Sequence, residues 1–291
     1  MITVDRLYVR YDDTNILEDI NLNLPTGITC AVIGPSGCGK STLLNVLAGL
    51  QKNYQGLVQI NGANPSPKKQ TIGFIPQNYG LLPWLTVKEN ILLGLKIKKE
   101  AKQGLPRNLV DNLGLSNLLN RYPNNLSGGQ QQRVSLARAF ALKADLLLMD
   151  EPFSALDAIT REEMQDVFID LWQKQKVSTI LVTHYVEEAL YLGQKIIVMT
   201  SAPGGIYKII DNPLFSDKNF RDREIFSSLS KEIRNYLFNI KWKSQKSLPM
   251  CDIIDDVMNL QFSEIFDYLS IQAVKEASTL DLAAFQEFIS K

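Results

Sequence analysis

The chain has 291 residues, of which 45% are hydrophobic, and its 31 Lys and Arg residues balance 31 Asp and Glu residues. This length allows one large domain with an appendage or two domains, and the apolar content excludes disorder along the whole chain. Zero formal net charge removes the simplest electrostatic argument for a nucleic-acid binder. Three cysteines favour a reducing compartment, and we find no signal peptide and no apolar stretch of the roughly 20 residues that span a bilayer. We therefore expect a chain that is soluble by itself.

In chain order, alternating and continuous apolar segments predict strands, and the third of them ends at a glycine-rich turn. A helix is predicted over 41–50, and a mostly helical block extends from 88 to 142. Alternation of strands with helices favours an α/β domain with a mainly parallel sheet, into which the helical block is inserted. The predicted strands are 3–9, 20–24, 29–33, 146–149, 179–182 and 195–199.

The charge pattern changes after about residue 213. Residues 217–246 carry eight Lys or Arg against four Asp or Glu, whereas residues 251–291 carry eight acidic residues against two Lys. Apolar residues at helical spacing predict amphipathic helices over 254–269 and 282–289. We expect a first domain over 1–212, with its helical insertion at about 78–142, and a mostly helical extension over 213–291. The extension could be a regulatory module, a contact between subunits, or a helical pair packed on the core.

A glycine-rich turn follows the strand at 29–33 and fits the pattern G-x-x-x-x-G-K-[ST]. Its glycines let several amide groups point at one anion, and the helix that follows adds its dipole and unpaired N–H groups. We expect Lys40 to neutralise the β- and γ-phosphates of a nucleotide and the Ser41 hydroxyl to hold Mg²⁺. The expected phosphate-binding residues are Gly34, Pro35, Ser36, Gly37, Cys38, Gly39, Lys40, Ser41 and Thr42.

A pair of acidic residues, Asp150 and Glu151, follows the apolar strand at 146–149. A buried parallel strand delivers such residues to the carboxyl edge of the sheet, where ligands of open α/β sheets bind. We expect Asp150 to bind Mg²⁺ through water and Glu151 to accept a proton from the water that attacks the γ-phosphate.

The pentapeptide Leu126-Ser-Gly-Gly-Gln130 precedes a predicted helix, which Ser127 can cap. Together with the glycine-rich turn and the acidic pair, it resembles the signature motif of the ATP-binding cassette (ABC) family. The resemblance covers about residues 1–210 and implies a P-loop ATPase with a mainly parallel central sheet, an N-terminal antiparallel β part and an inserted helical subdomain. It also implies that Ser127, Gly128, Gly129 and Gln130 complete the nucleotide site of a second copy of the chain.

Three further residues correspond to family positions. The resemblance implies that Tyr11 stacks on adenine, that Gln77 contacts Mg²⁺ and the attacking water, and that His184 contacts the γ-phosphate. His184 is the only histidine in the chain. Tyr185 is a departure, because the family usually has an acidic residue directly after this histidine.

The segments 81–90 and 153–161 look like those of the ATPase subunits of nitrate, sulfonate, taurine or pyrimidine-precursor importers. That subgroup commonly has a Pro-Gly-Arg triplet where this chain has Pro203-Gly-Gly205. The missing arginine counts against the assignment of a substrate. The family geometry also implies that the segment from Tyr79 to Trp84 receives a short helix of a membrane subunit, although the same residues could instead pack internally.

These features predict an ATP-hydrolysing transporter subunit that dimerises around ATP and Mg²⁺. The resemblance implies membrane permease subunits and a solute-binding protein as partners, a position on the cytoplasmic face of the membrane, and no nucleic acid. The alternatives are a soluble ABC ATPase acting on nucleic acid or ribosomes, and a degenerate cassette that binds ATP without hydrolysing it.

Overall fold

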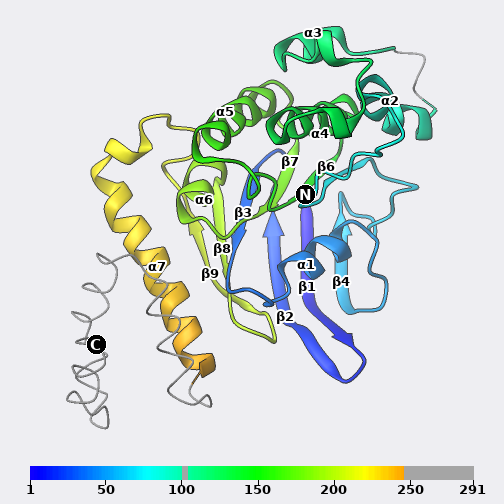
Figure 1. The fold of residues 1–291 in the computed structure, drawn as a ribbon. Coiled ribbons are helices and arrows are strands. Elements are labelled where there is room, and N and C mark those ends of the chain that lie inside the picture. The colour runs from blue at the N-terminus through cyan, green and yellow to red at the C-terminus, as the bar shows by residue number, and fades with distance from the viewer. Residues whose placement is uncertain (100–103, 246–291) are drawn as a thin grey trace, which may run out of the picture. The chain divides into compact units, whose positions relative to one another are not determined.

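The computed structural model describes residues 1–99 and 104–245 and contains two sheets (Figure 1). The smaller sheet is antiparallel, with strand order β2-β1-β4, and comprises β1 (Ile2–Tyr11), β2 (Thr14–Leu24) and β4 (Gln55–Ile60). The larger sheet has the order β5-β6-β7-β3-β8-β9, and only β9 runs antiparallel to its neighbour. Its strands are β3 (Thr29–Ile33), β5 (Ile72–Ile75), β6 (Leu146–Asp150), β7 (Ser178–Val182), β8 (Lys195–Met199) and β9 (Ile206–Asp211).

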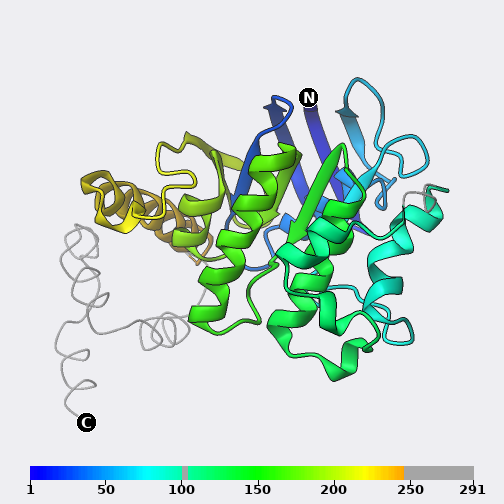
Figure 2. The same cartoon turned by 90° about the horizontal axis from the view of Figure 1, so that it is seen from above.

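The larger sheet separates two apolar cores, because successive side chains of a strand point to opposite faces. In β3, Ala31 and Ile33 lie in one core, and Cys30 and Val32 lie in the other. The first core is shared with α4 (Gly128–Ala141), α5 (Ala158–Gln175) and α6 (Val186–Leu192). The second is shared with α1 (Lys40–Leu47) and the antiparallel sheet. Figure 2 shows the blue N-terminal strands on one side of the large sheet and the green helices on the other.

The helical insertion contains α2 (Val87–Ile97), α3 (Arg107–Asn112) and α4, with 3-10 turns at Ser116–Leu118 and Pro123–Asn125. The start of α2 is fixed by a capping box between Thr86 and Glu89. Among residues 1–99 and 104–245, none of the helices has the length and apolar character needed to cross a bilayer.

Helix α7 (Glu224–Gln245) follows a 3-10 turn at Phe220–Asp222 and packs against the first core through Leu229, Ile233 and Ile240. Residues Met1–Trp242 form one compact unit. The domain boundary expected between 212 and 213 stays a prediction. The helices expected over 254–269 and 282–289 lie outside the described residues.

The predicted fold class is confirmed, including the antiparallel N-terminal part, and the strands at 29–33 and 195–199 have the predicted bounds. Helix α1 ends at Leu47 rather than at residue 50, because Gly49 has a left-handed φ of 70° that ends the helix. The sequence pattern missed β4, β5 and β9. Strand β5 has only four residues and includes a glycine, whereas β9 is an edge strand with mostly exposed side chains.

Candidate nucleotide-binding site

The glycine-rich turn connects the buried strand β3 to helix α1, as the sequence predicts. Gly37 and Gly39 have left-handed φ angles of 74° and 91°, and a Cβ on Gly39 would lie 2.6 Å from Leu17 Cδ2. Lys40 Nζ donates to the carbonyl oxygens of Gly34 at 2.8 Å and Pro35 at 2.7 Å. The ammonium group is therefore held inside the turn, where a phosphate group can approach both it and the N-terminus of α1.

The loop between β8 and β9 packs against this turn. The N–H of Gly204 donates to the Ile16 carbonyl at 2.8 Å, and its own carbonyl accepts from the Glu18 N–H at 2.9 Å. A Cβ on Gly204 would lie only 1.9 Å from the carbonyl oxygen of Cys38. The backbone at 204 therefore requires glycine, because it packs directly on the turn. The Cys38 thiol is buried here, and burial raises its pKa.

Asp150 ends β6 and lies beside the turn, as predicted. Burial raises the pKa of its carboxyl group, and the hydrogen bond from the Ser41 side chain and the positive charge of Lys40 act in the opposite direction. Ser41, Lys40 and Asp150 thus form one group at the carboxyl edge of the sheet, although they come from two different strand–helix connections.

Glu151 is the centre of a second group. Its Oε2 accepts a hydrogen bond from Gln77 Nε2 at 3.2 Å and lies 3.4 Å from Nδ1 of His184. The three residues follow β5, β6 and β7, whose carboxyl ends are adjacent because the strands are parallel neighbours. The backbone of Glu151 has a left-handed φ of 46°, and its N–H donates to the Val182 carbonyl at 3.0 Å. The structure therefore brings together an amide, a carboxyl group and an imidazole that are up to 107 residues apart in the chain.

The signature pentapeptide lies elsewhere. Ser127 is the N-cap of α4, and its hydroxyl accepts from the Gln130 N–H at 3.3 Å while Gln130 Oε1 accepts from the Ser127 N–H at 3.1 Å. The predicted capping by Ser127 is confirmed. Since α4 packs in one core and α1 in the other, the signature loop and the glycine-rich turn begin helices on opposite faces of the large sheet. Tyr11, at the end of β1, is 43% exposed.

Three buried or half-buried residues near the Glu151 group were not singled out by the sequence. Glu188 on α6 accepts from Gln165 Nε2 on α5 at 3.1 Å, and both side chains are buried. Arg161 on α5 donates to the carbonyl oxygens of Phe153 and Leu156. The spacing of Gln165 and Glu188 carries no motif of its own, because they meet only when α5 and α6 pack together.

Comparison with known proteins agrees with this geometry. A family model described as ABC transporter matches residues 17–154. The aliphatic sulfonates import ATP-binding protein SsuB of Bacillus licheniformis is 41% identical over 220 residues, which is 76% of this chain and 86% of that protein. The taurine import ATP-binding protein TauB of Escherichia coli K12 is 39% identical over 238 residues, or 81% and 91% of the two chains. This chain belongs to the ABC transporter family. It is an ATPase subunit of that family.

A solved ABC structure has the same fold. The ATP-binding cassette MJ0796, in a dimeric post-hydrolysis state bound to ADP and Pi, superposes with a TM-score of 0.62 at 30% identity. The match covers 72% of this chain and 98% of that cassette. A second family model, described as post-transcriptional regulator, matches residues 218–283 of this ABC subunit. This match begins within the extension expected after residue 212.

Proposed function

We propose that this ABC subunit binds ATP in the glycine-rich turn and hydrolyses it with Glu151 as the general base. The convergence of Gln77 and His184 on the Glu151 carboxylate, at the sheet edge that carries the turn, supports this proposal best. Lys40 and the amide groups from Gly34 to Thr42 hold the phosphates. Glu151 accepts the proton of the attacking water, Gln77 orients that water, and His184 contacts the γ-phosphate. Tyr11 stacks on the adenine, which its exposed position at the end of β1 allows.

The donor set beside the turn fits Mg²⁺, which prefers oxygen ligands and usually binds proteins through one or two carboxylates together with phosphates and water. The Ser41 hydroxyl, the Asp150 carboxylate and the Gln77 amide oxygen supply that chemistry. Asp150 is already hydrogen-bonded to Ser41, so these two ligands are held together before a metal binds. When bound, the ion neutralises phosphate charge.

We further propose that two copies of the chain enclose each ATP. The signature residues Ser127, Gly128, Gly129 and Gln130 begin α4 on the face of the sheet opposite to α1, so they are well placed to serve the nucleotide of a partner. The dimeric state of the MJ0796 cassette supports this arrangement. A γ-phosphate contacted from both sides favours the closed dimer, and its hydrolysis removes that preference.

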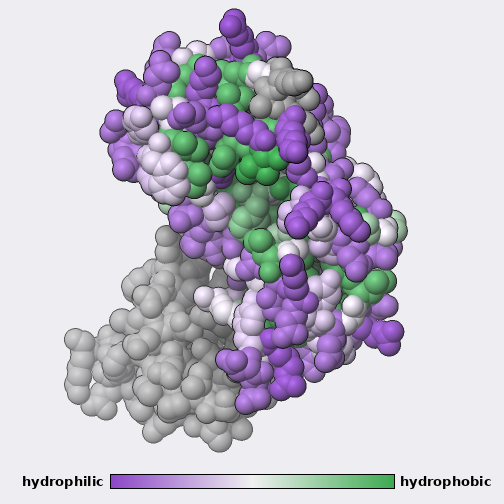
Figure 3. Space-filling view, turned by 90° about the vertical axis from the view of Figure 1, so that its right-hand side faces the viewer, coloured by the Kyte–Doolittle hydropathy of each residue, from purple (hydrophilic) through white to green (hydrophobic). Residues whose placement is uncertain are grey.

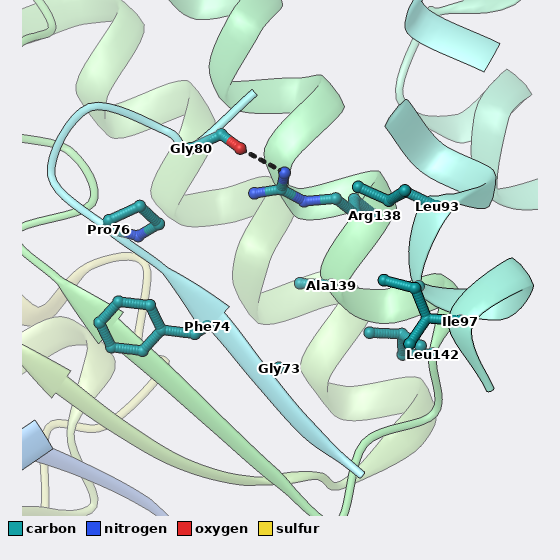
Figure 4. A pocket seen from close by; sticks show the side chains of 10 residues that line it. Gly73, Phe74, Pro76, Gly80, Leu93, Ile97, Arg138, Ala139 and Leu142 are labelled. Atoms are coloured by element: carbon teal, nitrogen blue, oxygen red, sulfur yellow. Dashed lines mark hydrogen bonds between the residues drawn. The ribbon is translucent and has the colours of Figure 1, made fainter. Parts of the chain in front are cut away.

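A groove between the sheet and the helical insertion supports a membrane permease as partner. It has a volume of about 320 Å³ and is lined on one side by Phe74 and Pro76 at the end of β5 and on the other by Leu93 and Ile97 of α2. Figure 4 shows these side chains around Arg138, whose guanidinium donates to the Gly80 carbonyl. Figure 3 looks onto the side of the molecule that carries α2 and β4, where apolar residues gather among polar ones. An apolar groove with a polar rim fits a short amphipathic helix.

The relatives named above are import proteins for aliphatic sulfonates and for taurine. We therefore propose that this subunit drives import of a small sulfonate-like solute, with nitrate and related solutes as the wider class. The solute is recognised by the permease and a solute-binding protein, and the subunit lies on the cytoplasmic face of the membrane. The same relatives favour this function over that of a soluble ABC ATPase acting on nucleic acid or ribosomes.

Glu151→Gln tests the hydrolytic role. Glutamine keeps the side-chain shape and an oxygen that can accept from Gln77, but it cannot accept the proton of water. We expect ATP binding to persist while turnover falls by roughly 10²- to 10⁴-fold, as for the loss of a general base. Phosphate release and equilibrium binding of ATP measure the two effects, with Glu187→Gln as the matched control. Turnover near that of the unchanged protein would show that another group is the base.

A further inference from the structure

The tyrosine that follows His184 lies between two other side chains of the site. Its ring centroid is 4.2 Å from that of His184, with the planes tilted by 40°. The guanidinium carbon of Arg161 also lies 4.3 Å from the centroid of the Tyr185 ring, within the range of a cation–π interaction. The N–H of Tyr185 also donates to the Thr183 hydroxyl at 3.0 Å, which fixes the backbone between β7 and α6.

Arg161 is itself held in place by the segment that follows Glu151. Its Nε donates to the Phe153 carbonyl at 3.3 Å, and one terminal nitrogen donates to the Leu156 carbonyl at 2.9 Å. Arg161 therefore joins the 153–156 backbone to the aromatic ring of Tyr185. A continuous set of contacts runs from the residues after Glu151, through Arg161 and Tyr185, to the imidazole that lies 3.4 Å from Glu151.

We propose that Tyr185 is a positioning residue, which holds the His184 imidazole toward Glu151 through its ring, and that Arg161 holds that ring. The His184 side chain is 47% exposed, so protein contacts limit its rotation only in part. The neighbouring Tyr185 ring restricts that rotation further. Both contacts of Tyr185 involve its ring, which Arg161 lies over and against which the His184 ring is tilted. The inference rests on the proposed role of His184 for its effect on turnover, but the orientation of the imidazole can be observed independently.

The first test is an NMR spectrum of the full chain without nucleotide. Because His184 is the only histidine, its ring protons give a single set of signals. A ring at 4.2 Å shifts these signals by its ring current. We expect Tyr185→Phe to keep their positions and Tyr185→Ala to move them toward those of a histidine in an unfolded peptide. Unchanged histidine signals in Tyr185→Ala would overturn the proposal, and a thermal unfolding curve identifies a variant that fails to fold.

The second test measures ATP turnover in a double-mutant cycle with His184→Ala. We expect Tyr185→Ala to lower kcat by about tenfold with a smaller effect on KM, because misplacement of a reacting group costs rate rather than binding. Tyr185→Phe is expected to restore the rate. In the His184→Ala background, Tyr185→Ala is expected to have little further effect, since the residue acts through the imidazole.

The outcomes separate the two proposals. Full turnover by His184→Ala would refute the proposed role of His184 but leave the NMR test of Tyr185 in force. A loss in His184→Ala without any loss in Tyr185→Ala would overturn the positioning role alone. Equal losses in Tyr185→Phe and Tyr185→Ala would also overturn it, because the hydroxyl and not the ring would then matter.

Discussion

Glu188 is a buried acidic residue close to the proposed catalytic group. Its side chain lies between α6 and α5 with 3% of its surface exposed, and burial raises the pKa of its carboxyl group to about 7. Hydrogen bonds from Thr183 and Gln165 and the charge of Arg161 favour the ionised form, whereas the charge of Glu151 opposes it. The folded protein therefore holds this proton more tightly than the unfolded chain does.

This difference predicts a pH-dependent stability. The stabilisation that comes from the protonated carboxyl is fully present below about pH 4.5, the ordinary pKa of a glutamate, and is lost as the pH rises through about 7. Glu188→Gln removes the titration. We expect the free energy of unfolding of the unchanged protein, relative to this variant, to fall by about 3 kcal/mol between pH 4.5 and pH 8.

Urea denaturation of both proteins across this pH range measures the effect, and Glu187→Gln is the control because that neighbouring carboxylate is exposed enough to pair with Arg221 at the surface. Parallel stability curves for the unchanged protein and Glu188→Gln would contradict the prediction.

The connection between β5 and α2 is a rigid element. The buried Asn90 side chain accepts from the Leu82 N–H at 2.8 Å and donates to the carbonyls of Leu82, Leu85 and Thr86. The carbonyls of Tyr79 and Gly80 accept from Arg138 on α4. Tyr79 and Asn90 therefore make the internal contacts that hold this connection in place. Trp84, for which the sequence left internal packing and partner contact open, is 69% exposed at the tip of the loop.

An exposed tryptophan, four residues after the groove-lining Gly80, is typical of an interface anchor. We expect Trp84→Ala to leave ATP binding by the isolated subunit unchanged and to weaken assembly with the permease by at least about tenfold, which corresponds to roughly 1.4 kcal/mol. Co-purification and titration with detergent-solubilised permease measure it. Leu50→Ala, which removes an apolar side chain of 63% exposure outside this loop, is the control. Equal assembly of the Trp84 and Leu50 variants would exclude Trp84 as an anchor.

At the scale of the whole molecule, residues 213–242 belong to the same compact unit as the residues that precede them. Arg221 forms ion pairs with Glu162 of α5 at 2.9 Å and Glu187 of α6 at 3.0 Å. Phe220 stacks on Tyr191 of α6 with ring centroids 5.4 Å apart. Helices α5 and α6 follow the segments that carry Glu151 and His184, so residues 220 and 221 contact the elements next to the site.

Helix α7 is therefore expected to contribute to the stability of the cassette. Ile233 is fully buried, and Ile233→Ala is expected to lower the free energy of unfolding by about 2–5 kcal/mol through lost burial and a residual cavity. Ile225→Ala, which changes a 47% exposed isoleucine on the same helix, is expected to stay within about 0.5 kcal/mol. Urea denaturation compares the two. A loss as small in Ile233→Ala as in Ile225→Ala would mean that α7 unfolds separately from the core.

Short local sequence patterns were enough to identify residues that we propose bind ATP and Mg²⁺. The glycine spacing from Gly34 to Lys40, the apolar strand that ends at Asp150, and the Ser127 cap are each encoded within about ten consecutive residues, because each needs only one turn, strand end or helix start. The same patterns were enough for an α/β class with a mainly parallel sheet, since alternating strands and helices leave few topologies open, whereas the antiparallel N-terminal part followed only from the family resemblance.

The tertiary structure alone decided how distant segments meet. Gly204 packs against Cys38, 166 residues earlier, and Glu188 acquires its raised pKa from the packing of α6 on α5. The contact of Tyr185 with Arg161 likewise joins helix α5 to the connection between β7 and α6. None of these has a spacing that a sequence pattern could reveal, because burial and contact across the sheet depend on where whole elements pack, and not on the residues next to them in the chain.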